Sequence, residues 1–225
     1  MEKINNFFVD RNKKIIPRIL TQICCDSSSE LLGCCDRNFW HYNITDFPSI
    51  ILQQAIYTIS KIDNSSALYS SSQFSELIEG GAIFWNKRAI RYRSFEEYYP
   101  YEKSFPALAF SSLSIAKLCY EKKIDLKIIE DGILKSISQL TNRFESKALN
   151  QQIAGITAAF YIKDLISTNK YDSLIYKLLD KTLDFQDDEG WFPEYGGPDL
   201  GYLSVSLDCL WDLYDLIKNE KVLSS

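Results

Sequence analysis

The sequence lacks three features that would assign it quickly to a functional class: an excess of basic residues, a long apolar run and an export signal. It has 25 Lys and Arg against 30 Asp and Glu, for a formal net charge of −5. No basic stripe is available to displace counterions, so a nucleic-acid partner is not expected. No uncharged run reaches about 18 apolar residues, which excludes membrane insertion. The polar stretch from Met1 to Lys14 has no apolar h-region, so we expect a cytoplasmic protein.

Cofactor and metal motifs are also missing. The chain has no P-loop, dinucleotide-binding glycine pattern, nucleophile elbow or H-E-x-x-H sequence, and no cofactor is expected. Its six cysteines follow none of the C-x-x-C spacings of zinc modules, so no metal site is expected either. Cys119 and Cys209 fall in uncharged stretches and are interpreted as small buried hydrophobic residues.

What the sequence does contain is an alternation of uncharged and charged helical stretches. A helix without charges on any side must be covered all round, whereas a helix with one charged face can meet water there. The uncharged stretches are Phe47 to Ser60, Phe105 to Cys119 with Lys117 as its one charge, Leu149 to Ile162, and Leu200 to Trp211 with Asp208 as its one charge. The charged stretches are Phe74 to Arg91, Leu126 to Arg143 and Tyr171 to Gln186.

The alternation predicts an all-α fold of stacked antiparallel helical hairpins, with an inner and an outer layer, that forms an incomplete α/α toroid. We expect one domain over residues 1–225. Residues 1–45 supply an N-terminal helix and a loop, and residues 46–225 supply the alternating inner and outer helices. Three inner helices have predicted N-caps at Asp46, Ser104 and Asp199.

Inner helices that run in the same direction bring the loops before them to one rim, and these loops are rich in aromatic and polar residues. Flat aromatic faces can stack on sugar rings, so we predict substrate-binding roles for some of them. An alternative is that these side chains only pack over helix ends. The substrate-binding candidates are Trp40, Tyr42, Tyr99, Tyr101, Gln151 and Trp191.

The catalytic candidates come from the same loops. Glu194 and Asp199 flank a Gly-Gly-Pro turn, and two facing carboxyl groups are what glycoside hydrolysis requires. His41, the only histidine, is a candidate general base for an elimination, with Tyr195 or Tyr202 as the proton donor. The structural alternatives are a helix cap for Asp199, a solvated loop residue for Glu194 and a packed side chain for His41.

One segment resembles known families. In LDFQDDEGWFPEYGGPDLGY, residues 183–202, Gln186, Gly190 and Trp191 resemble the Gln…Gly-Trp element of terpenoid cyclases and related toroids. The following EYGG-x-D-x-GY resembles carbohydrate-active toroids of the heparinase II/III and alginate-lyase type. Those families imply a polysaccharide held in a groove across the toroid. The chain is too short for a complete ring, and it lacks the aspartate-rich motifs of terpene chemistry.

The sequence therefore favours a protein that handles a glycan or polysaccharide in cell-surface polysaccharide metabolism. If it is an enzyme, the expected class is a polysaccharide lyase or a glycoside hydrolase. Two alternatives stay open: a non-catalytic binding or scaffold module, favoured by the short chain, and an isoprenoid-handling toroid, favoured by the Gln…Gly-Trp element.

Overall fold

The computed structural model describes residues 11, 14–35, 50–61, 71–91, 95–97 and 102–225. These residues are mostly helical and contain no named β-strand, so the predicted all-α class is confirmed for them. The elements, in chain order, are η2 (Ile51–Gln54), α2 (Ala55–Ser60), α3 (Ser71–Arg91), α4 (Phe105–Tyr120), α5 (Leu126–Leu140), α6 (Leu149–Leu165), α7 (Asp172–Leu183), α8 (Leu200–Ile217) and α9 (Glu220–Leu223).

Side-chain caps set the starts of several helices. The Ser104 side chain accepts a hydrogen bond from the Ala107 N–H, and Pro106 lies in the same first turn of α4. Asp199 likewise accepts from the Tyr202 N–H at the start of α8. Each cap pairs an amide that has no partner within its helix. Both predicted caps are confirmed, and the third, Asp46, lies outside the described residues.

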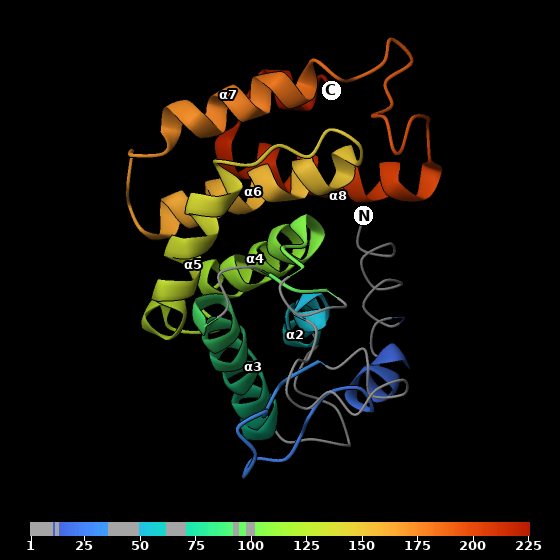
Figure 1. Ribbon diagram of the computed structural model, residues 1–225. Helices are drawn as coiled ribbons and strands as arrows, with labels where there is room; N and C mark the ends of the chain where they lie inside the picture. Colours follow the sequence, from blue (N-terminus) through green and yellow to red (C-terminus); the bar gives the residue numbers. More distant parts are fainter. Residues whose placement is uncertain (1–10, 12–13, 36–49, 62–70, 92–94, 98–101) are drawn as a thin grey trace.

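Helices α4 and α6 are buried on nearly every side, as their lack of charge predicted. They pack against each other at the centre of the molecule (Figure 1). The charged helix α5 buries one face only, through Ile129, Ile133 and Ile137, and exposes Leu134 on another. Burial therefore follows charge in these three helices, because an unpaired charge inside the core would be costly.

The fourth uncharged helix, α8, is not buried as predicted. Its face of Ser206, Cys209, Leu210 and Leu213 is buried, and in the described part of the chain α8 packs mainly on α6 and α9. On its other side the exposed fraction is 86% for Leu200, 52% for Leu207 and 65% for Trp211. The prediction was wrong here because low charge allows burial of a helix but does not supply a neighbour to cover it.

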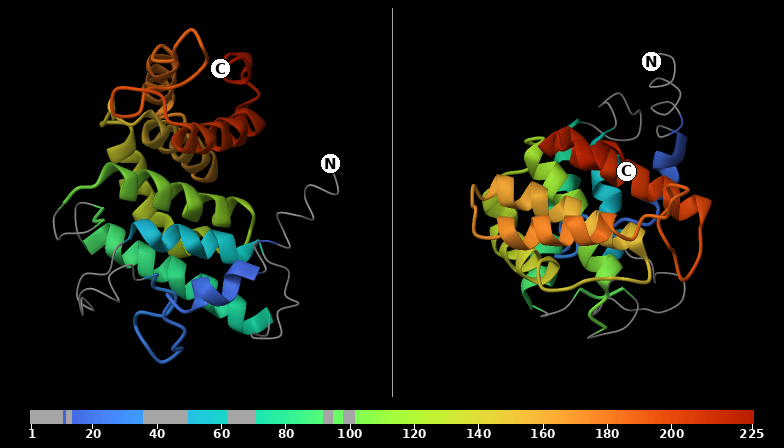
Figure 2. Two further views of the ribbon diagram at one scale, coloured as in Figure 1. Left: turned by 90° about the vertical axis from the view of Figure 1, so that its right-hand side faces the viewer. Right: turned by 90° about the horizontal axis from the view of Figure 1, so that it is seen from above.

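The uncharged helices, which alternate with charged helices in the sequence, contact one another in the structure. Helices η2 and α2 contact α4, α4 contacts α6, and α6 contacts α8. On the charged side, α3 contacts α5 and α7 contacts α6. The three helices α4, α6 and α8 all begin on the right-hand side of Figure 1, and Figure 2 shows η2 and α2 beside α4.

A close backbone crossing fixes the N-terminal part of the fold. Gly33 has φ +76, and a Cβ built on it would lie 2.1 Å from the Gly81 nitrogen in α3 and 2.6 Å from the Leu77 oxygen. Next to this crossing, the fully buried Gln53 donates from Nε2 to the carbonyls of Gly33 (2.7 Å) and Gly81 (3.0 Å). One amide thereby joins η2, α3 and the loop before residue 36.

This crossing predicts different costs for two glycine substitutions. Gly33→Ala should lower the free energy of unfolding by about 3 kcal/mol or more, because it adds overpacking to a left-handed backbone. Gly190→Ala should cost only about 1 kcal/mol, since Gly190 shares the positive φ (+91) but has no atom within 4 Å of the added Cβ. Urea unfolding of both variants measures the difference, and equal losses would contradict the crossing.

Candidate functional site

The starts of η2 and α4 meet at residues 95–97. The Ile50 N–H donates to the Glu96 carbonyl at 3.2 Å, and the Ser104 N–H donates to the Phe95 carbonyl at 2.7 Å. Within this loop, Glu96 forms a buried ion pair with Arg88 of α3 at 2.6 Å. The shared loop therefore ties the two N-terminal ends together.

The starts of α4, α6 and α8 are joined in a similar way. Arg143 donates to the Lys103 carbonyl at 2.9 Å, just before α4. The Leu149 N–H, at the start of α6, donates to the Pro193 carbonyl at 3.4 Å, in the loop that leads to α8. The described loops before α4, α6 and α8 thus lie along one rim. Trp40, His41, Tyr42, Tyr99 and Tyr101, which were predicted to share that rim, lie outside the described residues.

Glu194 is buried at this rim, with 6% of its surface exposed. Its Oε1 accepts a hydrogen bond from the Asn150 N–H at 2.6 Å, in the first turn of α6, where Ala148 provides no side-chain cap. Its Oε2 has no partner in the described structure. Burial raises the pKa of Glu194, the bond from Asn150 opposes this, and Asp199 and Glu145 raise it further. The interpretation of Glu194 as a solvated loop residue was wrong.

Four other candidates gather around Glu194. Tyr195 has φ +53 and is 68% exposed, and its ring centroid lies 6.4 Å from that of Tyr202. Gln151 donates from Nε2 to the Tyr195 hydroxyl at 3.3 Å. Asp199 accepts from the Tyr202 N–H at 2.9 Å, as the helix cap of α8. The rim therefore combines one buried carboxyl group with a pair of accessible tyrosine rings.

Trp191 stands apart from this group. It is half-buried, and its indole N–H donates to Glu189 in its own loop at 3.3 Å. The neighbouring Phe192, which is 2% exposed, reaches the core instead. Gln186 donates to the carbonyls of Gly190 (3.1 Å) and Ser225 (2.6 Å). The Gln…Gly-Trp element therefore orders its own loop and the chain end, with Phe192 as the core contact.

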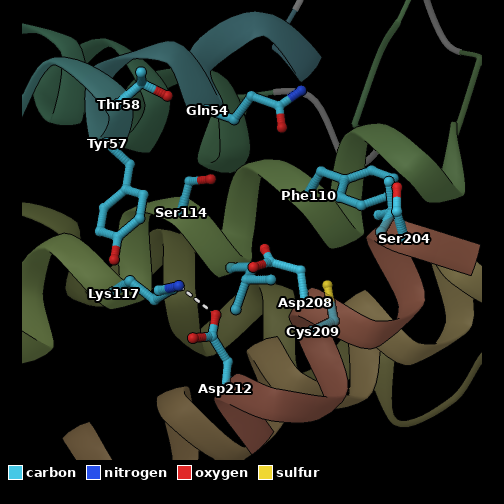
Figure 3. Close-up of a pocket in the computed structure, with 12 residues that line it drawn as sticks. Gln54, Tyr57, Thr58, Phe110, Ser114, Lys117, Ser204, Asp208, Cys209 and Asp212 are labelled. Atoms are coloured by element: carbon cyan, nitrogen blue, oxygen red, sulfur yellow. Dashed lines mark hydrogen bonds and ion pairs between the residues drawn. The ribbon is translucent and has the colours of Figure 1, made fainter. Parts of the chain in front are cut away.

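A groove that the sequence did not predict lies between α2, α4 and α8 (Figure 3). Its volume is about 670 Å³. It combines apolar, hydroxyl, amide and charged side chains. The lining residues are Gln54, Tyr57 and Thr58 from η2 and α2, Phe110, Leu113, Ser114 and Lys117 from α4, and Ser204, Val205, Asp208, Cys209 and Asp212 from α8.

An ion pair crosses one end of the groove. Lys117 of α4 pairs with Asp212 of α8, as the dashed line in Figure 3 shows. The Lys117 ammonium also lies 4.8 Å from the centroid of the Tyr57 ring. Both charged side chains are largely shielded from water, and the pair joins α4 to α8 across the groove.

A second polar contact extends this network to the end of α4. The Tyr57 hydroxyl donates to Glu121 Oε1 at 2.7 Å, and Lys61 pairs with the same oxygen at 2.6 Å. Burial, together with the bond to Glu121, raises the pKa of Tyr57 far above its ordinary value. Burial opposes ionisation of Glu121, but the bonds from Lys61 and Tyr57 outweigh it and lower the Glu121 pKa. Tyr57 therefore stays a neutral hydrogen-bond donor.

Asp208 differs from the other charged residues of the groove. It lies one turn before Asp212 on α8, and its carboxyl group points toward α4 in Figure 3. Among the described residues it makes no hydrogen bond and no ion pair. Partial burial and the neighbouring Asp212 raise the pKa of Asp208, and Lys117 opposes them. The sequence did carry a signal for this site, because Lys117 and Asp208 are the single charges of two otherwise uncharged stretches.

Comparisons of the chain with protein-family models, curated proteins and solved structures give no match. Among the helices of the described residues, none has the length and apolarity needed to cross a membrane. Within the same part of the chain, no three His, Cys, Asp or Glu side chains converge so that they could hold a metal ion. The site is therefore interpreted from its own geometry.

The buried Glu194 predicts a specific pH dependence of stability. Folding raises its pKa, so the folded state binds this proton more tightly than the unfolded chain does, and stability is lost as the pH rises from the ordinary carboxyl range through the raised value. Glu194→Gln keeps an acceptor for the Asn150 N–H and removes the charge. It should match or exceed the wild type in stability at neutral pH, with an advantage that shrinks in acid.

Chemical unfolding at several pH values tests this expectation. Glu194→Ala is the comparison, since it leaves the Asn150 amide without its acceptor and should cost about 1 to 3 kcal/mol at every pH. A Glu194→Gln variant that is clearly less stable than the wild type at neutral pH would show that the ionised carboxylate stabilises the fold.

Proposed function

We propose that the chain binds a glycan or polysaccharide in the groove between α2, α4 and α8, and that its helices form an incomplete α/α toroid of stacked hairpins. Two observations support the stacked arrangement. Helix α2 contacts α4, α4 contacts α6 and α6 contacts α8, and the loops before α4, α6 and α8 lie along one rim. The observation that carries the functional proposal is the mixed lining of the groove.

The lining suits a ligand with both apolar and hydroxyl-bearing faces. Phe110, Leu113 and Val205 offer apolar surface, while Ser114 and Ser204 offer hydroxyl groups. A sugar ring presents C–H groups on its flat faces and hydroxyl groups at its edge, so it can use both kinds of wall. Ligand sites commonly combine an apolar lining with a few placed polar groups in this way.

An exposed indole near the groove adds a surface for stacking. Trp211 follows Asp208 by three residues on α8, so the two side chains are neighbours on the helix surface. Its exposed fraction is 65%, and its ring centroid lies 6.2 Å from that of Tyr214. An exposed tryptophan beside a polar groove suits a saccharide that extends beyond it.

The same lining argues against the isoprenoid alternative. An isoprenoid chain has no group that could pair with Asp208, or with Lys117 and Asp212 if their ion pair opened. Seating such a chain against these side chains would remove water from a carboxylate and give nothing in return.

A hydrolase is the second candidate function, favoured by the unlike environments of two neighbouring aspartates. Glycoside hydrolysis uses one protonated and one ionised carboxyl group. In the groove, the pKa of Asp208 is raised, whereas Asp212 is ion-paired with Lys117. In this scheme Asp208 is the acid, and the rim residues Glu194 and Asp199 remain the alternative pair.

Blocking the groove tests the proposed function. Neutral, amine-bearing and acidic oligosaccharides are titrated against the full chain, and binding is measured by calorimetry and ligand-observed NMR. At least one should bind the wild type. Ser204→Trp should then lower its affinity by about tenfold or more, since an indole would occupy part of the cavity.

Leu174→Trp is the matched control. Leu174 is 43% exposed on α7, outside the groove, so affinity should stay within about twofold of the wild type, a change of less than ~0.5 kcal/mol. If Ser204→Trp binds the oligosaccharide as tightly as the wild type does, the binding site is not this groove. If no oligosaccharide binds the wild type, the glycan proposal is refuted.

A further inference from the structure

Most charges in and around the groove cancel in pairs. Lys117 is paired with Asp212, and Lys61 is paired with Glu121. The Tyr57 hydroxyl is also committed, because it donates to Glu121. The two cations are therefore already neutralised, and neither is free to receive an acidic ligand without the loss of an existing ion pair.

One negative charge is left over. Asp208 lines the groove as an exposed side chain, and among the described residues it makes no hydrogen bond and no ion pair. Its carboxyl group points into the space between α4 and α8 (Figure 3). The groove thus presents one unpaired carboxylate beside hydroxyl groups and apolar surface. A ligand that displaces water from this carboxylate has to replace the water with a hydrogen-bond donor, and a positively charged donor gains most.

We infer that the groove selects sugars with a free amino group, and that Asp208 is the residue that binds the ammonium group. This inference rests on the proposed glycan-binding function and specifies its substrate class. The ammonium group would donate to the Asp208 carboxylate, while the ring hydroxyls would meet Ser114 and Ser204. An ammonium group at this position would stabilise the ionised form of Asp208, against the partial burial and the neighbouring Asp212 that raise its pKa.

The same charges disfavour uronates, which are the substrates implied by the resemblance to alginate-lyase toroids. A uronate carboxylate in this groove would face Asp208 and Asp212, and it would have to compete with Asp212 for Lys117. Like charges in close contact are repulsive, and partial shielding from water strengthens the repulsion. The order of affinity expected is therefore amine-bearing first, N-acetylated second and uronate last.

The test uses three oligosaccharides of equal length: a glucosamine oligomer, its N-acetylated counterpart and a uronate oligomer. Spermidine is added as an amine without a sugar ring. Affinities are measured by calorimetry for the full chain. Asp208→Asn should reduce the preference for the glucosamine oligomer over its N-acetylated counterpart by roughly five- to tenfold, because it removes a charge-assisted hydrogen bond.

Two further variants isolate the charge at this position. Asp208→Glu keeps the charge and should keep the preference. Asp131→Asn changes the net charge by the same amount on the exposed surface of α5, away from the groove, and should leave the preference unchanged. Melting curves for all variants check that each protein is folded.

Each other outcome overturns a defined part of the account. If the N-acetylated or uronate oligomer binds the wild type as well as the glucosamine oligomer does, or if Asp208→Asn keeps the preference, the amine selectivity is wrong and glycan binding stands. If spermidine binds as tightly as the glucosamine oligomer, the groove is a cation site without sugar recognition. If no oligosaccharide binds the wild type, the proposed function itself fails.

Discussion

The rest of the structure depends on the contact between α4 and α6. Both helices are uncharged over most of their length and buried on nearly every side, so each needs apolar neighbours all round. Helices η2, α2 and α5 cover α4, and α5, α7 and α8 cover α6. The outer positions can carry charge because only one of their faces is buried. The central pair therefore determines which segments surround it.

The groove lies where α8, after covering α6, is not packed closely against α2 and α4. Helix α8 packs on α6 but leaves a polar face turned toward α2 and α4, and the ion pair between Lys117 and Asp212 spans the space between them. Without this pair, two charges in a partly shielded site would lose their partners. The pair joins the two walls of the groove. It also neutralises the lysine, so that Asp208 sets the charge that a ligand meets.

Much of the fold could be predicted from the sequence, because the signals concerned are local. The burial of α4 and α6 follows from their own lack of charge, and the caps at Ser104 and Asp199 follow from residues within one turn. The exposure of α8 depends on the absence of a neighbour, which its own residues do not encode. The burial of Glu194 depends on an amide 44 residues away, at Asn150. The groove was not predicted because Lys117 and Asp208 were each treated as a single exception in an uncharged helix. A lone charge in such a helix was the available signal that part of the helix faces a polar space.

The most direct test of this account is the position of the bound ligand, mapped by amide chemical shifts in a titration with the glucosamine oligomer. The account predicts that the largest changes fall on Ser114 to Lys117 of α4 and on Ser204 to Asp212 of α8, while α7 is unaffected. Changes confined to the rim around Glu194 and Tyr195, with none in the groove, would contradict it.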